Sequence, residues 1–484
     1  MIGMMTQLFV VTAVLPSQGK YVTVCHQGVS ASILSREENM EHKQSRIHRR
    51  QLLRCAGLGV SAAVIQQLLA GCAVNPVTGQ SQLMMVSESQ ELGIDRQQSP
   101  QQFSTDYGVV PDARLNAYIS RVGREVAARS HRPQIPFSFR AVNAAYVNAY
   151  AFPGGSIAAT RGILAEMENE AELAALLGHE IGHVSARHTA QQASKGMLAN
   201  LVLAGVSVAT SAAGMEGTGD LVQGLGGLGA GALLASYSRD HERQADALGM
   251  QYMTAAGYSP QGMVDLMDML RQTNKRQPGA LDLMFSTHPM SDERFATAQQ
   301  AVATSYRDRV NQAVNRERYM DETASVRRLK PMLTSLQQAS EAAGKKRYGQ
   351  AEQLFKQAIQ QGPGDYTALL MMAKFQMGTK NGPAAEKYGQ EAIRAYPGEA
   401  QAYLVTGLAA LGNKRFEHAY QLLGQYDRLL PGNAQIVFYQ GYALEKMGRQ
   451  NDAAQKYRTY LQRQKQGKEA QYAYNRLKSW GYLR

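Results

Sequence analysis

Cysteine is nearly absent from this 484-residue chain, which contains only Cys25, Cys55 and Cys72. All three lie in a leading segment that carries the features of an export signal. Cleavage before Cys72 and attachment of a lipid to its sulfur would leave the mature protein without a free thiol or a disulfide. We therefore expect a protein that tolerates an oxidising compartment without depending on it for stability.

The leading segment also lacks an apolar run of about 20 residues, the length that a membrane-spanning helix needs. A basic stretch at 42–54 precedes a short apolar stretch at 55–69, and the sequence L-A-G-C then ends at Cys72. This order is typical of a secretory signal, here with a lipoprotein-like cleavage site. We predict that residues 1–71 are an upstream stretch and a signal peptide, with Met40 as the true start, and that Cys72 is lipidated.

Ala73 follows the predicted lipid site, and the absence of aspartate at this position favours sorting to the outer membrane. We expect a periplasmic protein with a lipid anchor in the outer membrane, in which the polar, turn-rich residues 72–100 form a tether. The pair Arg49-Arg50 also fits a twin-arginine signal, which exports folded proteins. A short membrane anchor that is never cleaved is the alternative. An exported chain is not expected to bind nucleic acid.

The strongest chemical signal is the sequence His179-Glu180-Ile181-Gly182-His183. Residues four apart share one face of a helix, so both imidazoles can reach one cation, and neutral imidazole suits Zn²⁺. Glu180 lies beside the first histidine, where a carboxylate can take a proton from an activated water. The motif predicts hydrolysis by such a water, most often of a peptide bond.

The residues around the motif favour a buried helix over a surface helix with two isolated histidines. Leu173 and Leu177 lie at helical spacing and give the segment an apolar face. Gly178 and Gly182 are poor helix formers, so their presence predicts close packing against another element or a substrate. His188 follows the motif by five residues and is expected to be structural.

A catalytic zinc site needs a third protein ligand and an open position. The segment 238–246 offers Glu242 as the ligand and Asp246, four residues later, as a partner for the free N–H of a ligand histidine. His241 is a rival ligand. It points about 100° away from Glu242 on a helix, so we expect it at the surface.

Four separated motifs resemble the M48 family of zinc metallopeptidases in their order and spacing. They are N-A-Y-A-F-P-G-G at 148–155, H-E-I-G-H at 179–183, S-R-D-H-E-R-Q-A-D at 238–246 and S-T-H-P at 286–289. The resemblance covers about residues 75–310. It implies a gluzincin-like site with one Zn²⁺ per chain and with His179, His183 and Glu242 as ligands. Glu180 would act as the general base.

The same resemblance assigns roles to three further places in the chain. His288 would be a regulatory fourth ligand that holds the enzyme latent. The alternative is a loop histidine that caps the helix beginning near Ser291. Arg294 would stabilise the tetrahedral oxyanion. A substrate backbone would add as another strand beside an edge strand made of Asn148, Ala149, Tyr150, Ala151 and Phe152.

The last third of the chain repeats with a period of 34 residues. The pair Pro-Gly recurs at 363, 397 and 431, and alanine recurs at 351, 385, 419 and 453. A helix–turn–helix unit of this length is typical of tetratricopeptide repeats. We predict that residues 335–484 stack as about four helix pairs into an α-solenoid. Gly389 interrupts a column that otherwise holds aromatic or apolar residues.

Positive charge is concentrated in these repeats. Residues 331–484 hold 21 lysines and arginines against 11 acidic residues, a net charge of +10, whereas the whole chain carries +12. A basic surface near a membrane suits acidic partners or anionic lipid headgroups. The repeats are therefore expected to dock substrate or an outer-membrane assembly machine. A solvated basic surface without a partner is the alternative.

Residues 197–237 are rich in glycine, alanine, leucine and valine, and their only charges are Glu216 and Asp220. We expect a cover over the cleft or a helical pair packed on the core. A membrane hairpin is the alternative, although each apolar half is shorter than the roughly 20 residues of a span.

The sequence therefore predicts a mainly α protein. A helix-rich, gluzincin-like peptidase domain with a small β-sheet occupies residues 101–325, and the α-solenoid follows. The predicted function is zinc-dependent endoproteolysis of unfolded or misassembled envelope proteins. The alternative is a lipid-anchored repeat scaffold or chaperone with a structural or silent zinc site. The presence of Glu180 favours the enzyme, because a structural zinc site has no need of a base.

Overall fold

The computed structural model of the chain describes residues 11–14, 21–24, 72–84, 86–192, 194, 237–276 and 281–483. The chain divides into two units, Met1–Ile65 and Gln66–Arg484. The described part of the first unit is an antiparallel hairpin of β1 (Val11–Val14) and β2 (Tyr21–Val24). The rest of the predicted signal peptide, including Met40, lies outside the described residues.

Two predictions about membranes are left open. Cys72 is the first residue of β3 (Cys72–Val74), and its lipidation stays a prediction. Residues 197–236 of the apolar stretch lie outside the described residues, together with their predicted role as a cover or a hairpin. Among the helices that the structure describes, none is long and apolar enough to cross a bilayer.

The segment 72–100, predicted to be a tether, contains a hairpin and most of a helix. β3 pairs with β4 (Ser81–Leu83), and α3 (Glu88–Thr105) follows. A capping box starts α3, because the Ser87 hydroxyl accepts from the backbone N–H of Gln90 and the Gln90 side chain accepts from that of Ser87. The structure therefore differs from the prediction over the second half of this segment.

Buried ion pairs fix α3 to residues 101–325, the predicted peptidase domain, here called the peptidase region. The Glu91 carboxylate lies 2.8 Å from Arg132 Nη2 and 2.7 Å from Arg187 Nε, and all three side chains are buried. Arg132 follows α4 (Ala113–Ala127) and Arg187 follows α6 (Glu170–Ser185). One carboxylate thus ties α3 to the ends of two helices. Its loss would leave the buried Arg187 without an acidic partner and Arg132 with only the exposed Glu88.

Three strands form the sheet of the peptidase region, namely β5 (Ser138–Val142), β6 (Ala149–Ala151) and β7 (Ser156–Thr160). β5 runs parallel to β7 and β6 runs antiparallel to it, so the order is β5-β7-β6 and β6 lies at one edge. Alternate side chains of β6 pack into different hydrophobic clusters. Ala149 and Ala151 join the main core, whereas Tyr150 packs in an aromatic cluster with Phe103.

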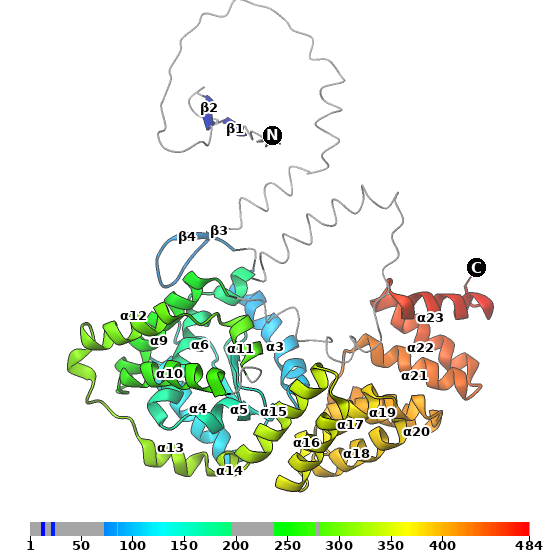
Figure 1. Ribbon diagram of the computed structural model, residues 1–484. Helices are drawn as coiled ribbons and strands as arrows, with labels where there is room; N and C mark the ends of the chain where they lie inside the picture. The colour runs from blue at the N-terminus through cyan, green and yellow to red at the C-terminus, as the bar shows by residue number, and fades with distance from the viewer. Residues whose placement is uncertain are drawn as a thin grey trace, which may run out of the picture. The chain divides into compact units, whose positions relative to one another are not determined.

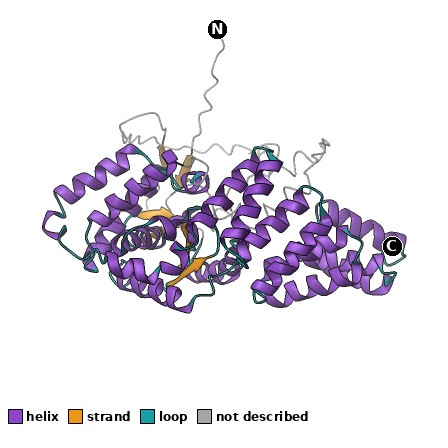
Figure 2. Cartoon of the chain, turned by 60° about the horizontal axis from the view of Figure 1, so that its bottom comes forward, coloured by secondary structure: helices purple, strands orange, loops and turns teal. Residues whose placement is uncertain are grey.

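Helices make up most of the second unit, and the prediction of a mainly α fold with a small sheet is confirmed (Figure 2). The remaining helices of the peptidase region are α5 (Arg161–Glu166), α9 (Arg239–Ala255), α10 (Gln261–Arg276), α11 (Asp282–Thr287), α12 (Asp292–Ala303), the 3₁₀ turn η2 (Arg307–Arg309), α13 (Arg316–Glu322) and α14 (Ala324–Arg327). Every residue of α6 is buried, and this helix packs against α4, α9, α10 and β6 (Figure 1). Asn169 caps its start by accepting from the N–H of Glu172.

Two glycines of α6 allow α9 to approach its backbone. A Cβ atom at Gly178 would lie 3.0 Å from the carbonyl oxygen of Gly249, and one at Gly182 would lie 3.0 Å from that of Ala245. The prediction of close packing at these glycines is confirmed, and the partner is the helix that carries Glu242. This short separation lets side chains from both helices meet at one point.

Replacing Gly249 with alanine is expected to push α6 and α9 apart. The new Cβ would lie 2.8 Å from the backbone nitrogen of His179, closer than any real contact of this kind. We expect the free energy of unfolding to fall by about 1–3 kcal/mol and the predicted zinc site to bind its metal more weakly. Gly93 is the matched control, because it lies inside α3 with open space around it, and alanine there should stabilise by about 0.5–1 kcal/mol. Equal thermal shifts in the two variants would contradict the steric argument.

The C-terminal helices pair in sequence order. They are α15 (Lys330–Gly344), α16 (Tyr348–Gln361), α17 (Tyr366–Gly378), α18 (Gly382–Ala395), α19 (Ala400–Gly412), α20 (Phe416–Leu429), α21 (Ala434–Lys446), α22 (Gln450–Arg463) and α23 (Lys468–Ser479). The first pair begins at Lys330, five residues before the predicted start of the repeats. The predicted period reappears in the backbone, since left-handed residues end the first helix of each pair at Lys346, Lys380, Lys414 and Gly448.

Gly389 interrupts the predicted aromatic column for a steric reason. A Cβ atom there would lie 2.2 Å from Thr406 Oγ1 of the following helix. The threonine hydroxyl instead donates 2.6 Å to the carbonyl oxygen of Ala402 within its own helix. The exception in the repeat pattern therefore marks a close approach of α18 and α19.

The first repeats share the core of the peptidase region. One cluster of buried apolar side chains runs from Val110 through α6 to Met372 of α17. At the same junction, the buried Arg161 contacts Asp365 at 2.7 and 3.2 Å, and Thr367 donates to the carbonyl oxygen of Asn143. The predicted boundary between two domains is therefore a packed interface within one unit.

Candidate active site

Four side chains from three segments converge in the interior of the peptidase region. His179 and His183 come from α6, Glu242 comes from the first turn of α9, and His288 directly follows α11. All four are buried, and one nitrogen or carboxylate oxygen of each lies within 4.8 Å of those of the others. The structure thus brings the three predicted ligands and the predicted fourth ligand together.

The distances show how tightly these groups face one another. His183 Nε2 lies 3.0 Å from His179 Nε2 and 3.3 Å from Glu242 Oε1. His288 Nδ1 lies 3.2 Å from the same carboxylate oxygen. Burial works to raise the pKa of Glu242, but the neighbouring imidazoles outweigh it and hold this pKa well below its usual value. An anionic carboxylate among imidazoles is a donor set that fits Zn²⁺.

Glu180 lies beside this cluster without belonging to it. Its Oε1 is 3.8 Å from His288 Nε2, and its Oε2 is buried with no hydrogen-bond partner among the described residues. Burial raises the pKa of this carboxyl, while the charges of His288 and His179 work in the opposite direction. A buried carboxylate oxygen without a protein partner is placed to bind a water or a substrate N–H.

Asp246 was predicted to partner a ligand histidine, and its Oδ1 lies 2.9 Å from His179 Nδ1. Arg294 also reaches the site, but its contacts differ from the expected oxyanion role. The guanidinium donates twice to Asp246, at 2.6 and 2.7 Å, and its Nη1 lies 2.7 Å from Glu242 Oε2. Because these carboxylates engage the guanidinium, the geometry supports a positioning role for Arg294 in place of a contact with the oxyanion.

Two neighbours of His183 were not identified as site residues from the sequence. His188 Nδ1 lies 3.0 Å from His183 Nδ1, and the Tyr237 ring stacks on the His183 ring with centroids 3.8 Å apart. Burial lowers the pKa of His188 to about 3, so this imidazole is neutral at pH 7. His241, expected at the surface, stacks on His188 with centroids 4.2 Å apart. Only proximity to the motif could have pointed to these residues.

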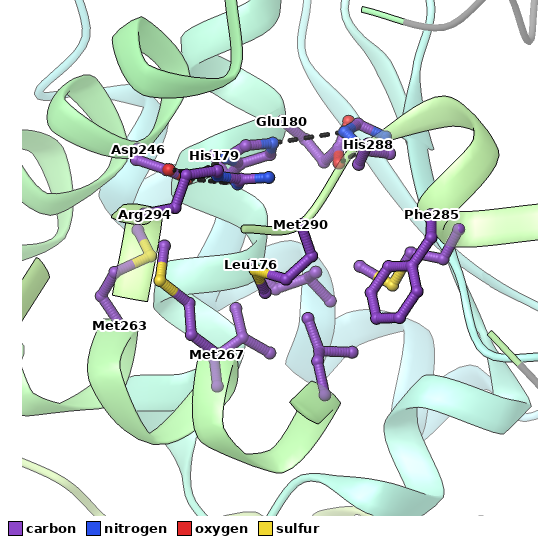
Figure 3. A pocket seen from close by; sticks show the side chains of 13 residues that line it. Leu176, His179, Glu180, Asp246, Met263, Met267, Phe285, His288, Met290 and Arg294 are labelled. Atoms are coloured by element: carbon purple, nitrogen blue, oxygen red, sulfur yellow. Dashed lines mark hydrogen bonds and ion pairs between the residues drawn. The ribbon is translucent and has the colours of Figure 1, made fainter. Parts of the chain in front are cut away.

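An apolar cavity of about 30 Å³ opens onto this group of polar side chains. Figure 3 shows the Met263, Met267 and Met290 side chains gathered on one side of His179, with Phe285 beyond them. The cavity is also lined by Leu176, Leu266, Leu270 and Met284. Methionine is flexible and fills irregular gaps, so this wall can adapt to an apolar group larger than the cavity.

The predicted substrate strand occupies the edge of the sheet. Ala149, Tyr150 and Ala151 form β6, and Asn148 and Phe152 flank it. Both polar atoms of the Asn148 side chain are buried without a hydrogen-bond partner among the described residues. Its role in binding substrate stays a prediction.

Comparison with known proteins decides the class of this domain. The sequence model of Peptidase family M48 matches residues 113–302, which include the whole cluster. Residues 113–302 are an M48 peptidase domain. A tetratricopeptide-repeat model matches residues 342–408, so the M48 domain is followed by such repeats. The match to this family implies that the domain is a metallopeptidase.

Similarity to individual proteins is confined to parts of the chain. The β-barrel assembly-enhancing protease of Yersinia pestis is 29% identical over 201 residues, which are 40% of this chain and 40% of that protein. The mitochondrial metalloendopeptidase OMA1 of Arabidopsis thaliana is 33% identical over 36% of this chain and 33% of its own length. A solved tetratricopeptide-repeat protein of Thermus thermophilus is 20% identical, with a TM-score of 0.27, over 31% of this chain and 83% of its own.

Proposed function

We propose that this chain is a zinc-dependent endopeptidase of the bacterial cell envelope that cleaves unfolded or misassembled proteins. The observation that carries the proposal is the buried cluster of His179, His183 and Glu242. Beside it lies Glu180 Oε2, which has no hydrogen-bond partner among the described residues. The similarity to the β-barrel assembly-enhancing protease of Yersinia pestis supports the location.

The roles of the residues follow from their contacts. His179, His183 and Glu242 would hold the metal, and zinc, when bound, supplies Lewis acidity to a water and to the scissile carbonyl. Glu180 Oε2 would accept the proton of the attacking water and deliver it to the leaving amine. Asp246 orients the His179 imidazole, and Arg294 holds Asp246 and Glu242 in place.

The shape of the site favours extended, apolar segments as substrates. The edge strand β6 offers a backbone to which an extended segment can add. The methionine-lined cavity beside Glu180 suits an apolar side chain next to the scissile bond. Unfolded proteins expose both features, whereas folded proteins bury them.

Removal of the metal tests this proposal. The purified chain is expected to cleave an unfolded protein such as casein, and a strong chelator is expected to abolish the cleavage. Restoring Zn²⁺ to the same sample should restore cleavage, because the buried side chains that supply the donors stay in the protein when the metal is removed. Cleavage that persists with less than one-tenth of the zinc left would contradict a metal-dependent site.

We propose that His288 acts as a latch. Its Nδ1 faces Glu242 at 3.2 Å and its Nε2 faces Glu180 at 3.8 Å, so its ring lies between the predicted ligand and the predicted base. His288→Ala is expected to raise cleavage of casein by about tenfold, the change that releasing about 1.4 kcal/mol would produce. Zinc content should be measured in parallel. Unchanged or lower activity at equal zinc content would remove the latch.

One observation favours a second candidate function. With His288 included, the cluster offers four buried donors, as structural zinc sites do. A repeat scaffold or chaperone with a silent zinc site would use the tetratricopeptide repeats alone. The two candidates differ in cells, because a scaffold would work equally well with Glu180→Gln.

We also propose a lipid anchor at Cys72 in the outer membrane and a docking role for the basic repeats. The L-A-G-C sequence supports the anchor, and the net charge of +10 over 331–484 supports an acidic substrate region or assembly machine as partner. Metabolic labelling with a radioactive fatty acid tests the first point, and Cys72→Ser should lose the label.

A further inference from the structure

The two histidines of α6 present the same edge to the centre of the cluster. His179 Nε2 and His183 Nε2 lie 3.0 Å apart, and both face Glu242. Each ring therefore turns its Nδ1 outward, away from the position of a metal. What binds each Nδ1 decides which nitrogen carries the proton and which offers a lone pair.

The outward nitrogens have different partners. His179 Nδ1 is 2.9 Å from the Asp246 carboxylate, the partner predicted from the sequence. His183 Nδ1 is 3.0 Å from Nδ1 of His188, and His188 Nε2 is in turn 2.9 Å from Gln244 Oε1. Gln244 belongs to α9, so the helix that carries Glu242 also supports both histidines of α6.

The direction of these hydrogen bonds follows from the chemistry of each atom. An amide oxygen can only accept, so His188 Nε2 must carry a hydrogen and donate to Gln244. A neutral imidazole has one N–H, so His188 Nδ1 is an acceptor. His183 Nδ1 must then carry the hydrogen between the two rings, which leaves the lone pair of His183 on Nε2, facing Glu242.

The fold holds His188 in this position from several sides. Arg187, with φ of 61°, makes the turn after α6, and its guanidinium is anchored on Glu91 and on the carbonyl oxygen of Val86. His188 is fully buried, and the His241 ring stacks on it. A residue five positions beyond His183 is thereby folded back onto it.

We propose that His188, fixed by Gln244, is the positioning residue that sets the tautomer and the ring orientation of the metal ligand His183. It is the uncharged counterpart of Asp246 behind His179. The assignment rests on the proposed metal site, and it deepens that site by adding a second support through His188, which lies outside the four motifs. Because the support is neutral, it orients the ligand without adding negative charge to the cluster.

The test measures zinc affinity by competition with a chromophoric chelator, together with the visible spectrum of the Co²⁺-loaded chain. His188→Phe keeps a ring in the core but removes both nitrogens, and we expect zinc affinity to fall by about 10- to 100-fold. Gln244→Met removes the accepting oxygen at a partly exposed position and should weaken zinc binding by several-fold. Gln244→Glu keeps an accepting oxygen and should bind zinc more tightly than Gln244→Met does.

His418→Phe is the matched control, since His418 also pairs with a glutamine, Gln390, but lies in the repeats. It should leave zinc affinity and the Co²⁺ spectrum unchanged. Wild-type zinc affinity in Gln244→Met and in every folded preparation of His188→Phe would overturn the assignment of His188. A wild-type chain that binds no zinc at all would instead overturn the proposed metal site, and the assignment with it.

Discussion

Glu180→Gln is expected to lower the rate of casein cleavage by at least about 100-fold while leaving zinc bound. A positioned general base contributes roughly 10²- to 10⁴-fold, and glutamine cannot accept the proton of the attacking water. Zinc content should be unchanged, because Glu180 is not among the four donors of the cluster. Parallel measurements of cleavage and of bound zinc on wild type and variant check both halves of this expectation.

Glu172→Gln is the control for the loss of a buried glutamate from the same helix. Burial raises the pKa of Glu172 to about 7, so part of this carboxyl is already neutral at pH 7 and glutamine is a mild replacement. We expect this variant to keep its activity. If Glu180→Gln cleaves as fast as wild type, Glu180 is not the base. If neither wild type nor Glu180→Gln cleaves casein although both bind zinc, a scaffold or a peptidase closed by His288 becomes the better interpretation.

Asp365→Asn is expected to lower the free energy of unfolding by about 3–5 kcal/mol, the typical effect of breaking a buried ion pair. Arg161 is 3% exposed, and asparagine would leave its guanidinium without a counter-charge at the junction of the peptidase domain and the repeats. Asparagine still caps α17 in the way that Asp365 does by accepting from the N–H of Ala368, so the loss reports the ion pair. Chemical denaturation measures the change.

Asp452→Asn is the matched control for the same substitution at an exposed ion pair. Asp452 and Arg449 are each about half exposed, at 49% of their side-chain surface. Exposed pairs contribute little, so we expect a change below about 1 kcal/mol. Equal effects of the two substitutions would contradict a large contribution of the Arg161–Asp365 pair to stability.

Local spacing was enough to predict the parts of this protein that lie on single elements. His179 and His183 share one turn of a helix, so their common orientation follows from helical geometry alone. The 34-residue period of the repeats is equally local, because each unit folds as a helix pair against its neighbours. Gly178 and Gly182 indicated a close approach, although the sequence did not show that α9 would be the partner.

Contacts between distant segments were decided only by the tertiary structure. Arg294 is a clamp on Asp246 and Glu242 because α12 packs beside α9, and no spacing in the sequence encodes that contact. The segment predicted as a tether is instead partly helical. Its Glu91 pairs with two arginines that follow other helices, and these ion pairs hold the segment against the rest of the fold.

The sequence by itself therefore predicted which side chains meet at the site, namely two imidazoles and a carboxylate on one helix and a second carboxylate on another. The tertiary structure decided which outer groups support them, as His188 and Gln244 show. It also decided that the first repeats share the peptidase core and do not hang from a linker. The physical reason is the same in both cases. Backbone geometry propagates over a few residues, whereas hydrogen bonds and packing between segments depend on how the whole chain closes on itself.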